Sequence, residues 1–179
     1  GNLYSGLLAQ RMGLPVKAFV AATNANDTGP RCLESGEFLP RPVVATLSRD
    51  LDTGSPSNWP RIQALLEERP GTLRALLRWG RRSDEATLAS VRDLGASGWP
   101  PHPASAVAHG VLREHLGPAE VGIVLATAHP AKAAGLLWDR LDLDPGLPLP
   151  LAEIPDKPEG GRPLPAEFEA LKAALQRKD

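Results

Sequence analysis

The first third of the chain begins with apolar residues at helical spacing. They predict a helix over residues 3–12, which Gly13 ends because glycine readily takes the left-handed conformation at a helix C-terminus. The short apolar run 16–22 follows, and its lack of polar alternation predicts a buried strand. A polar loop, 23–28, comes directly after it. This order of helix, strand and polar loop is typical of an α/β fold with a parallel sheet.

The same order recurs later in the chain. Residues 105–116 have a helical pattern that ends at Gly117, and residues 121–126 form a second apolar run that predicts a buried strand. The loop 127–130 follows, and residues 131–141 again have a helical pattern. We therefore expect two α/β units that contribute parallel strands to one sheet.

The segments outside these two units are predicted to be helices and one long surface excursion. Helices are expected over residues 62–68, 72–79 and 83–94, with Ser83 as the N-cap of the last. Residues 144–165 are rich in proline, glycine and charge, which favours a linker or surface excursion. A short helix over 166–176 closes the chain.

The polar loops are the places where this pattern predicts chemistry, because ligands of open α/β sheets bind beyond the carboxyl ends of the strands. Loops 23–28 and 127–130 both occupy such positions. Asparagine, aspartate and threonine also form turns and helix caps, so a structural role stays open for both loops. Gly1-Asn2 precedes a helix, where backbone N–H groups suit a phosphate, although two terminal residues alone establish little.

Composition and charge exclude several classes of protein. The 179 residues include 20 basic and 21 acidic side chains, which argues against nucleic acid as the main partner. No apolar run reaches the ~20 residues of a membrane helix, so no membrane partner is expected. The single cysteine, Cys32, suits a reducing compartment, and we expect a cytoplasmic location. The four histidines lack metal-ligand spacing, so no metal site is predicted.

Several uncommon motifs, taken in order, resemble those of the threonine synthases. They span residues 1–132 and are Gly1-Asn2, RMGLPVK at 11–17, AATNANDT at 21–28, ATLS at 45–48, PSNWPR at 56–61, SAVA at 105–108 and ATAHPAK at 126–132. The resemblance implies a pyridoxal-phosphate enzyme of fold type II, the tryptophan-synthase-β type, with parallel strands and flanking helices. It also implies the conversion of O-phospho-L-homoserine and water to L-threonine and phosphate.

The resemblance assigns expected roles to three residues. Gly1 and Asn2 match the last two positions of the family's phosphate-binding loop, so Asn2 is expected to bind the phosphate of pyridoxal 5'-phosphate. Thr127 is expected to face the pyridine nitrogen of that cofactor. In such enzymes the cofactor acts as an electron sink for carbanions.

The departures from the family pattern are equally specific. The Schiff-base lysine lies upstream of the phosphate loop in the family, so no catalytic residue is assigned here. We expect a C-terminal portion that is inactive alone and has the missing N-terminal half as its partner. Ala104 occupies the position of a family histidine, with His102 two residues earlier, and Ala133 replaces an expected aromatic residue.

The sequence thus predicts a division into three parts. Residues 1–143 would be part of the cofactor domain, 144–165 the surface excursion and 166–179 a terminal helix. Two alternative functions stay open: another fold-type II enzyme, such as a dehydratase or phospho-lyase, and a non-catalytic scaffold or interaction protein.

Overall fold

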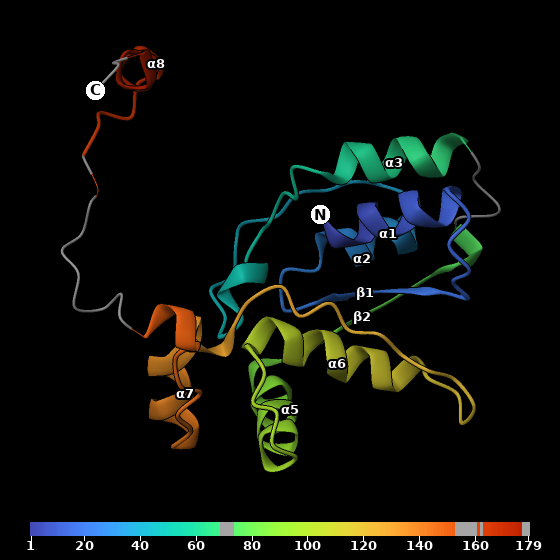
Figure 1. The fold of residues 1–179 in the computed structure, drawn as a ribbon. Coiled ribbons are helices and arrows are strands. Elements are labelled where there is room, and N and C mark those ends of the chain that lie inside the picture. The colour runs from blue at the N-terminus through green and yellow to red at the C-terminus, as the bar shows by residue number, and fades with distance from the viewer. Residues whose placement is uncertain (69–73, 153–160, 162, 177–179) are drawn as a thin grey trace. The chain divides into compact units, whose positions relative to one another are not determined.

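A computed structural model describes residues 1–68, 74–152, 161 and 163–176 of the chain. The chain divides into two compact units, Gly1–Gly146 and Leu147–Asp179. The larger unit contains the sheet and the helices labelled α1 to α7 in Figure 1.

Two parallel strands form the sheet of the larger unit. β1 (Phe19–Thr23) pairs with β2 (Leu77–Arg81) in a register that places Phe19 opposite Leu77 and Thr23 opposite Arg81. The carboxyl ends of the two strands therefore lie side by side. The expected α/β class, with parallel strands and flanking helices, is confirmed.

Three helices cover one face of the sheet: α1 (Asn2–Arg11), α2 (Thr28–Ser35) and α3 (Trp59–Glu68) (Figure 1). Their apolar side chains form the main core with one residue of β2; the buried members are Leu7, Leu33, Trp59, Ile62, Leu65 and Leu77. The ring of Phe38 stacks on the Trp59 indole at a centroid distance of 5.8 Å. Burial of these side chains removes apolar surface from water and fixes the helices on the sheet.

The opposite face of the sheet is covered by α6 (Pro103–His115), which contacts both strands and also α5 (Asp84–Ala96). β2 and α6 pack closely at Gly80, where a Cβ would lie 2.6 Å from a Val111 methyl group. A short 3₁₀ helix, η2 (Pro130–Ala133), leads into α7 (Ala134–Leu141). A second core joins α5, α6 and α7 through Val91, Ala106 and Leu137.

Several predicted helix boundaries are correct to within a few residues. Gly13 has φ +104°, as expected of a residue just beyond a helix, and follows the C-cap of α1. The Ser83 hydroxyl accepts a hydrogen bond from the Ala86 N–H at 3.2 Å and caps α5. Local signals such as caps and glycine stops determine these ends.

The predicted helix over residues 72–79 is wrong from residue 77 onward, although residues 74 and 75 are helical. Residues 77–79 belong to β2, while residues 72 and 73 lie outside the described residues. Pairing with β1 satisfies the backbone of this segment and buries Leu77, and these tertiary contacts override its helical spacing.

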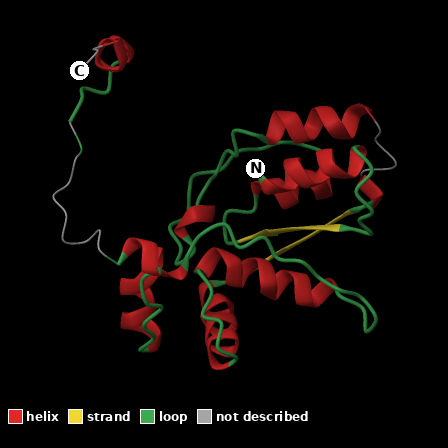
Figure 2. Cartoon of the chain, viewed as in Figure 1, coloured by secondary structure: helices red, strands yellow, loops and turns green. Residues whose placement is uncertain are grey.

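The predicted strand over residues 121–126 is also absent. These residues belong to the loop that runs from the end of α6 to η2 (Figure 2). A strand requires a hydrogen-bonded neighbour, and the two strands of the described sheet pair with each other.

The smaller unit contains a 3₁₀ helix, η3 (Leu149–Leu151), and α8 (Phe168–Gln176). The predicted terminal helix is confirmed, although it begins two residues later than expected. Residues 153–160, 162 and 177–179 lie outside the described residues. The functional division at residues 143 and 165 stays a prediction.

Candidate functional site

The side-chain amide of Asn26 holds the loop that follows β1. It makes two hydrogen bonds to the backbone of Val44, as the backbone of a neighbouring strand would. Its Nδ2 donates to the Val44 carbonyl and its Oδ1 accepts from the Val44 N–H, each at 2.8 Å. The loop 23–28 is thereby joined to the segment that contains residues 44–52, with no backbone ladder between them.

Asn24 lies at the centre of the same polar network and is 1% exposed. Its Nδ2 lies 2.8 Å from both Thr46 Oγ1 and Asp52 Oδ1, and its Oδ1 accepts from the Asn26 N–H at 2.9 Å. Asp52 Oδ2 accepts from the Thr46 N–H at 3.0 Å. These contacts engage the amide group of Asn24 inside the protein, so Asn24 supports the loop rather than binding a ligand.

A buried carboxylate joins this loop to the end of the neighbouring strand. Asp27 accepts a hydrogen bond from Arg31 Nε at 2.9 Å and another from the guanidinium of Arg81, the last residue of β2. Burial raises the pKa of Asp27, but the hydrogen bonds and charges of Arg31 and Arg81 outweigh it, so the pKa is lowered overall. The carboxyl edge of the sheet therefore carries a stable ion pair.

A cavity of about 350 Å³ lies where α6 begins, and two segments far apart in sequence meet there. It is lined by residues 99–102, Ser105 and residues 126–130. The Nδ1 of His102 accepts a hydrogen bond from the Ala104 N–H at 3.3 Å and caps α6, while Pro103 takes the first helical position. His102, rather than Ala104, therefore occupies the position that leads into this helix.

His102 is also the buried member of a charged cluster beside the cavity. Its Nε2 lies 3.9 Å from Asp50 Oδ2, and the Nζ of Lys132 lies 3.9 Å from the same oxygen. Burial lowers the pKa of His102, Asp50 raises it and Lys132 lowers it, with a net lowering. The imidazole is therefore neutral at pH 7, with its unprotonated Nδ1 on the helix and its Nε2–H towards the Asp50 carboxylate.

The three site residues expected from the sequence occupy two places. Thr127 lines the cavity, and its side chain is exposed. Gly1 is the N-cap of α1 and Asn2 is the first helical residue; both are exposed and neither lines the cavity. The structure thus brings Thr127 together with His102 and His129, and it leaves Gly1 and Asn2 at a helix N-terminus.

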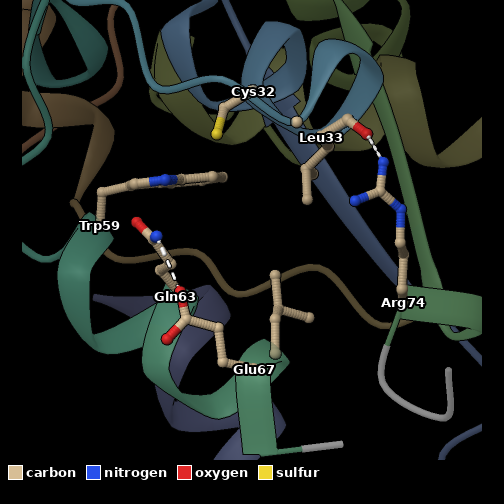
Figure 3. A pocket seen from close by; sticks show the side chains of 8 residues that line it. Cys32, Leu33, Trp59, Gln63, Glu67 and Arg74 are labelled. Atoms are coloured by element: carbon tan, nitrogen blue, oxygen red, sulfur yellow. Dashed lines mark hydrogen bonds between the residues drawn. The ribbon is translucent and has the colours of Figure 1, made fainter. Parts of the chain in front are cut away.

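A second cavity, of about 210 Å³, lies between α2 and α3 (Figure 3). Its walls include Cys32, Leu33 and Trp59, and the buried Nε1–H of Trp59 has no hydrogen-bond partner in the described structure. Gln63 donates to Glu67 at 2.9 Å on one wall, as Figure 3 shows. None of the expected site residues lines this cavity.

Two further properties hold for the described residues. None of their helices is long and apolar enough to cross a membrane. They also contain no group of three or more His, Cys, Asp or Glu side chains placed to hold a metal ion.

Sequence reasoning did not single out the charged residues around these sites. No local pattern indicates a role for Asp50, Asp52, Arg81 or Lys132. Lys132 closes the ATAHPAK motif, and Asp50 and Asp52 lie between the ATLS and PSNWPR motifs, so proximity to motifs was the available signal. Their partners come from distant segments, which no local pattern indicates.

Comparison with known proteins decides the relationship of the chain. No protein-family model matches it. Threonine synthase of Escherichia coli K12 is 43% identical over 179 residues, and that of Serratia marcescens is 42% identical over 175 residues; each alignment covers 98% of this chain. The chain is a homologue of the threonine synthases. The match extends beyond residue 132, where the motif resemblance ended.

The solved threonine synthases share this fold. The crystal structure from E. coli has a TM-score of 0.82 at 42% identity and covers 97% of this chain. The pyridoxal-phosphate-bound structure from Brucella melitensis has a TM-score of 0.80 at 28% identity and covers 96%. The chain spans about 41% of the length of the curated threonine synthases that it matches.

Proposed function

We propose that this chain forms part of a pyridoxal-phosphate-dependent threonine synthase, which converts O-phospho-L-homoserine and water to L-threonine and phosphate. The observation that carries the proposal is 43% identity to the E. coli enzyme across 98% of the chain. The TM-score of 0.80 against the cofactor-bound Brucella enzyme supports the choice of cofactor. Since the chain spans about 41% of its relatives, the complete activity requires further polypeptide.

The start of α1 fits the phosphate of the cofactor. No side chain caps this helix, so the N–H groups of its first turn remain free of a side-chain acceptor. A Cβ on Gly1 would meet no atom within 4 Å, so the space in front of the helix is open. We assign Asn2 and these backbone N–H groups to phosphate binding, where the helix dipole also favours a negative charge.

The hydroxyl of Thr127 suits the ring nitrogen of the cofactor. A neutral hydroxyl both donates and accepts, so it orients a pyridine ring without fixing a charge on the nitrogen. When bound, the cofactor supplies an electron sink for the carbanions formed as the γ-phosphate leaves and water adds. The polar network around Asn24 and the cap at His102 hold the surrounding loops in place.

The Schiff-base lysine is assigned to polypeptide outside this chain. None of the five lysines lies in the family context, and the resemblance places the catalytic lysine upstream of Gly1. The isolated chain is therefore expected to be inactive. Residues 1–143 would provide its share of the cofactor domain, with 144–165 as a surface excursion and 166–179 as a terminal helix.

The proposed function is tested by joining this chain to the rest of a threonine synthase. We define the complementary polypeptide as the part of E. coli threonine synthase that this chain does not match. Alone, the chain should show neither cofactor absorbance nor phosphate release from O-phospho-L-homoserine. Joined ahead of Gly1, the complementary polypeptide should restore both, together with L-threonine. Cofactor absorbance or phosphate release by the isolated chain would contradict the assignment of the lysine.

Two pairs of variants of the joined protein test the residue roles. Thr127→Ala should alter the absorbance of the bound cofactor, whereas Thr127→Ser should preserve it because the hydroxyl remains. Asn2→Ala should weaken cofactor binding, whereas Ser5→Ala, one turn along the same helix, should not. Equal effects of Asn2→Ala and Ser5→Ala would remove Asn2 from the phosphate site.

The same joined protein separates the alternative functions. A dehydratase would release ammonia and 2-oxobutyrate from threonine, and a phospho-lyase would release phosphate without forming threonine. A scaffold protein would bind no cofactor, either as the chain alone or when joined to the complementary polypeptide.

A further inference from the structure

A buried hydroxyl without a hydrogen-bond partner lines the cavity at the start of α6. Ser105 is 3% exposed and is one of the residues around this space of about 350 Å³. Its backbone N–H donates to the His102 carbonyl at 2.8 Å, but its hydroxyl makes no hydrogen bond to any residue that the structure describes. Buried polar groups in proteins are nearly always paired, so the Ser105 hydroxyl is suited to a ligand in this cavity.

The same cavity is lined by a second hydroxyl residue, Thr127. Ser105 lies in the first turn of α6, whereas Thr127 belongs to the loop 127–130, so the fold brings the two residues to one space. Each hydroxyl donates one hydrogen bond and accepts others. The cavity therefore offers two hydroxyl groups, from separate segments, to one small ligand.

The lining of the cavity is polar without being charged. The described residues around it carry no carboxylate, ammonium or guanidinium group. Both of its histidines cap a helix: the Nδ1 of His129 accepts from the Ala131 N–H at 3.1 Å, as the Nδ1 of His102 accepts from the Ala104 N–H. An imidazole that accepts a hydrogen bond at Nδ1 carries its ring proton at Nε2. Such a lining suits a neutral polar ligand group better than an anion.

The first turn of α6 also lacks the free N–H groups that a phosphate would need. Pro103 has no N–H, and the Ala104 N–H donates to the His102 imidazole. The N–H groups of Ser105 and Ala106 donate to the His102 carbonyl at 2.8 and 3.1 Å. Phosphate sites at helix N-termini depend on such groups, which the uncapped start of α1 offers instead. The group that lies beside Ser105 is therefore expected to be the ring of the cofactor rather than its phosphate.

We propose that Ser105 is a further cofactor-binding residue, whose hydroxyl donates a hydrogen bond to the same edge of the pyridine ring that Thr127 contacts. The inference rests on the proposed function, from which it takes the identity of the ligand. Two acceptors lie along that edge, the ring nitrogen and the phenolic oxygen. Two hydroxyl groups from separate segments fix the orientation of the ring in its plane, which a single hydrogen bond leaves free to pivot.

The affinity of the joined protein for pyridoxine 5'-phosphate tests this contact. The compound has the ring and the phosphate of the cofactor but no aldehyde, so its binding does not depend on a bond to the Schiff-base lysine. Ser105→Ala should weaken its binding about three- to tenfold, the range expected for one hydrogen bond, and should leave the affinity for inorganic phosphate unchanged. Unchanged affinity for pyridoxine 5'-phosphate would overturn the proposal. Equal weakening of both ligands would do the same, because it would place Ser105 at the phosphate.

A matched serine and a stability measurement distinguish binding from a structural role. Ser90 is the control, because it is also a helical serine but its hydroxyl donates to the Ala86 carbonyl at 3.1 Å within α5. Ser90→Ala should leave the affinity for pyridoxine 5'-phosphate unchanged. In the joined protein without ligand, Ser105→Ala should keep or raise the midpoint of denaturant unfolding, since alanine is the better helix former and the hydroxyl has no hydrogen bond to lose. A lowered midpoint would show that the hydroxyl supports the fold, and it would overturn the proposal.

Two analogues of pyridoxine 5'-phosphate identify the acceptor on the ring. One has C–H in place of the ring nitrogen, and the other has hydrogen in place of the phenolic hydroxyl. The effect of Ser105→Ala should disappear with one of the two analogues, which identifies its acceptor. An effect that persists with both would show that Ser105 does not contact this edge of the ring.

The outcomes also separate this inference from the proposed function. A joined protein that forms threonine, and whose Ser105→Ala variant binds pyridoxine 5'-phosphate as tightly as the unaltered protein, would leave the function standing and remove the role of Ser105. A joined protein that binds neither pyridoxal 5'-phosphate nor pyridoxine 5'-phosphate would remove the function and, with it, the ligand assigned to Ser105.

Discussion

Two loops of this protein begin from the same sequence pattern and differ in the structure. Residues 23–28 and 127–130 each follow a short apolar run. The first run contains β1, and its loop is buried in a hydrogen-bonded network with residues 44–52. The second run lacks a paired strand, and Thr127 in its loop is exposed. The two runs differ in the contacts that the chain itself supplies. β1 pairs with β2 through backbone hydrogen bonds, whereas residues 121–126 pack against α6 and have no strand beside them in the described structure.

The largest expected effect is at the centre of the first loop. Asn24→Ala should lower the free energy of unfolding by about 2–3 kcal/mol, because it removes the Oδ1 that accepts from the buried Asn26 N–H and the Nδ2 that donates to Thr46 and Asp52. Denaturant unfolding of the chain measures the loss. Thr127→Ala is the matched control in the second loop, and it should change stability by less than about 0.5 kcal/mol. Similar losses for the two variants would contradict the contrast between the loops.

The next effect depends on pH and concerns the ion pair at the carboxyl edge. The pKa of Asp27 is lowered in the folded protein, so its contribution is complete above about pH 4 and is lost as the pH falls through the folded pKa. Asp27→Asn should remove this part of the acid dependence and cost about 1.5–3 kcal/mol at pH 7. Unfolding measured between pH 7 and pH 3 checks it. An unchanged slope with pH would show that Asp27 is not paired.

A smaller effect is expected at the cap of α6, beside the second loop. His102→Ala should cost about 1 kcal/mol, and His102→Asn should cost less because asparagine is a good N-cap. The pKa of His102 is lowered, so protonation below about pH 6.5 should destabilise the native protein, and both variants should lose that dependence. Thermal unfolding at pH 7.5 and 5.5 measures both. Equal losses for alanine and asparagine would argue against the cap.

The smallest effect is expected in segment 121–126, at an exposed side chain. Ile123→Ala in the chain alone should change the free energy of unfolding by less than about 0.5 kcal/mol, because the side chain has little to lose. Gly122→Ala, one residue away, should destabilise by more, since its Cβ would meet Leu112 and Leu116. Denaturant unfolding of the two variants compares neighbouring positions of one segment. A larger loss for Ile123→Ala would mean that this side chain is already covered.

Local signals account for the parts of the fold that could be predicted. The glycine after α1, the serine cap of α5 and the helical spacing of α6 act within a few residues, so they can be read along the chain. The apolar run that contains β1 was also identified, although the strand begins at Phe19 rather than at residue 16. The helical spacing over residues 72–79 does not reveal β2, because the pairing of β2 with β1 joins residues almost sixty positions apart.

The candidate site was predicted in outline and not in its contacts. Motif order pointed to Thr127 and to His102, which meet at one cavity. It did not indicate that Asp50 and Lys132 lie beside His102, or that Arg81 reaches Asp27. Such ion pairs depend on side chains from separate elements, whose distances are set by packing.

The sequence by itself determined the α/β class, the positions of most helices and the relationship to the threonine synthases, since these follow from residue spacing, caps and motif order. The tertiary structure alone decided which apolar runs become strands. Residues 77–81 and 121–126 show why: strand formation depends on backbone hydrogen bonds to a neighbour, and a neighbour is a property of the folded assembly rather than of the segment.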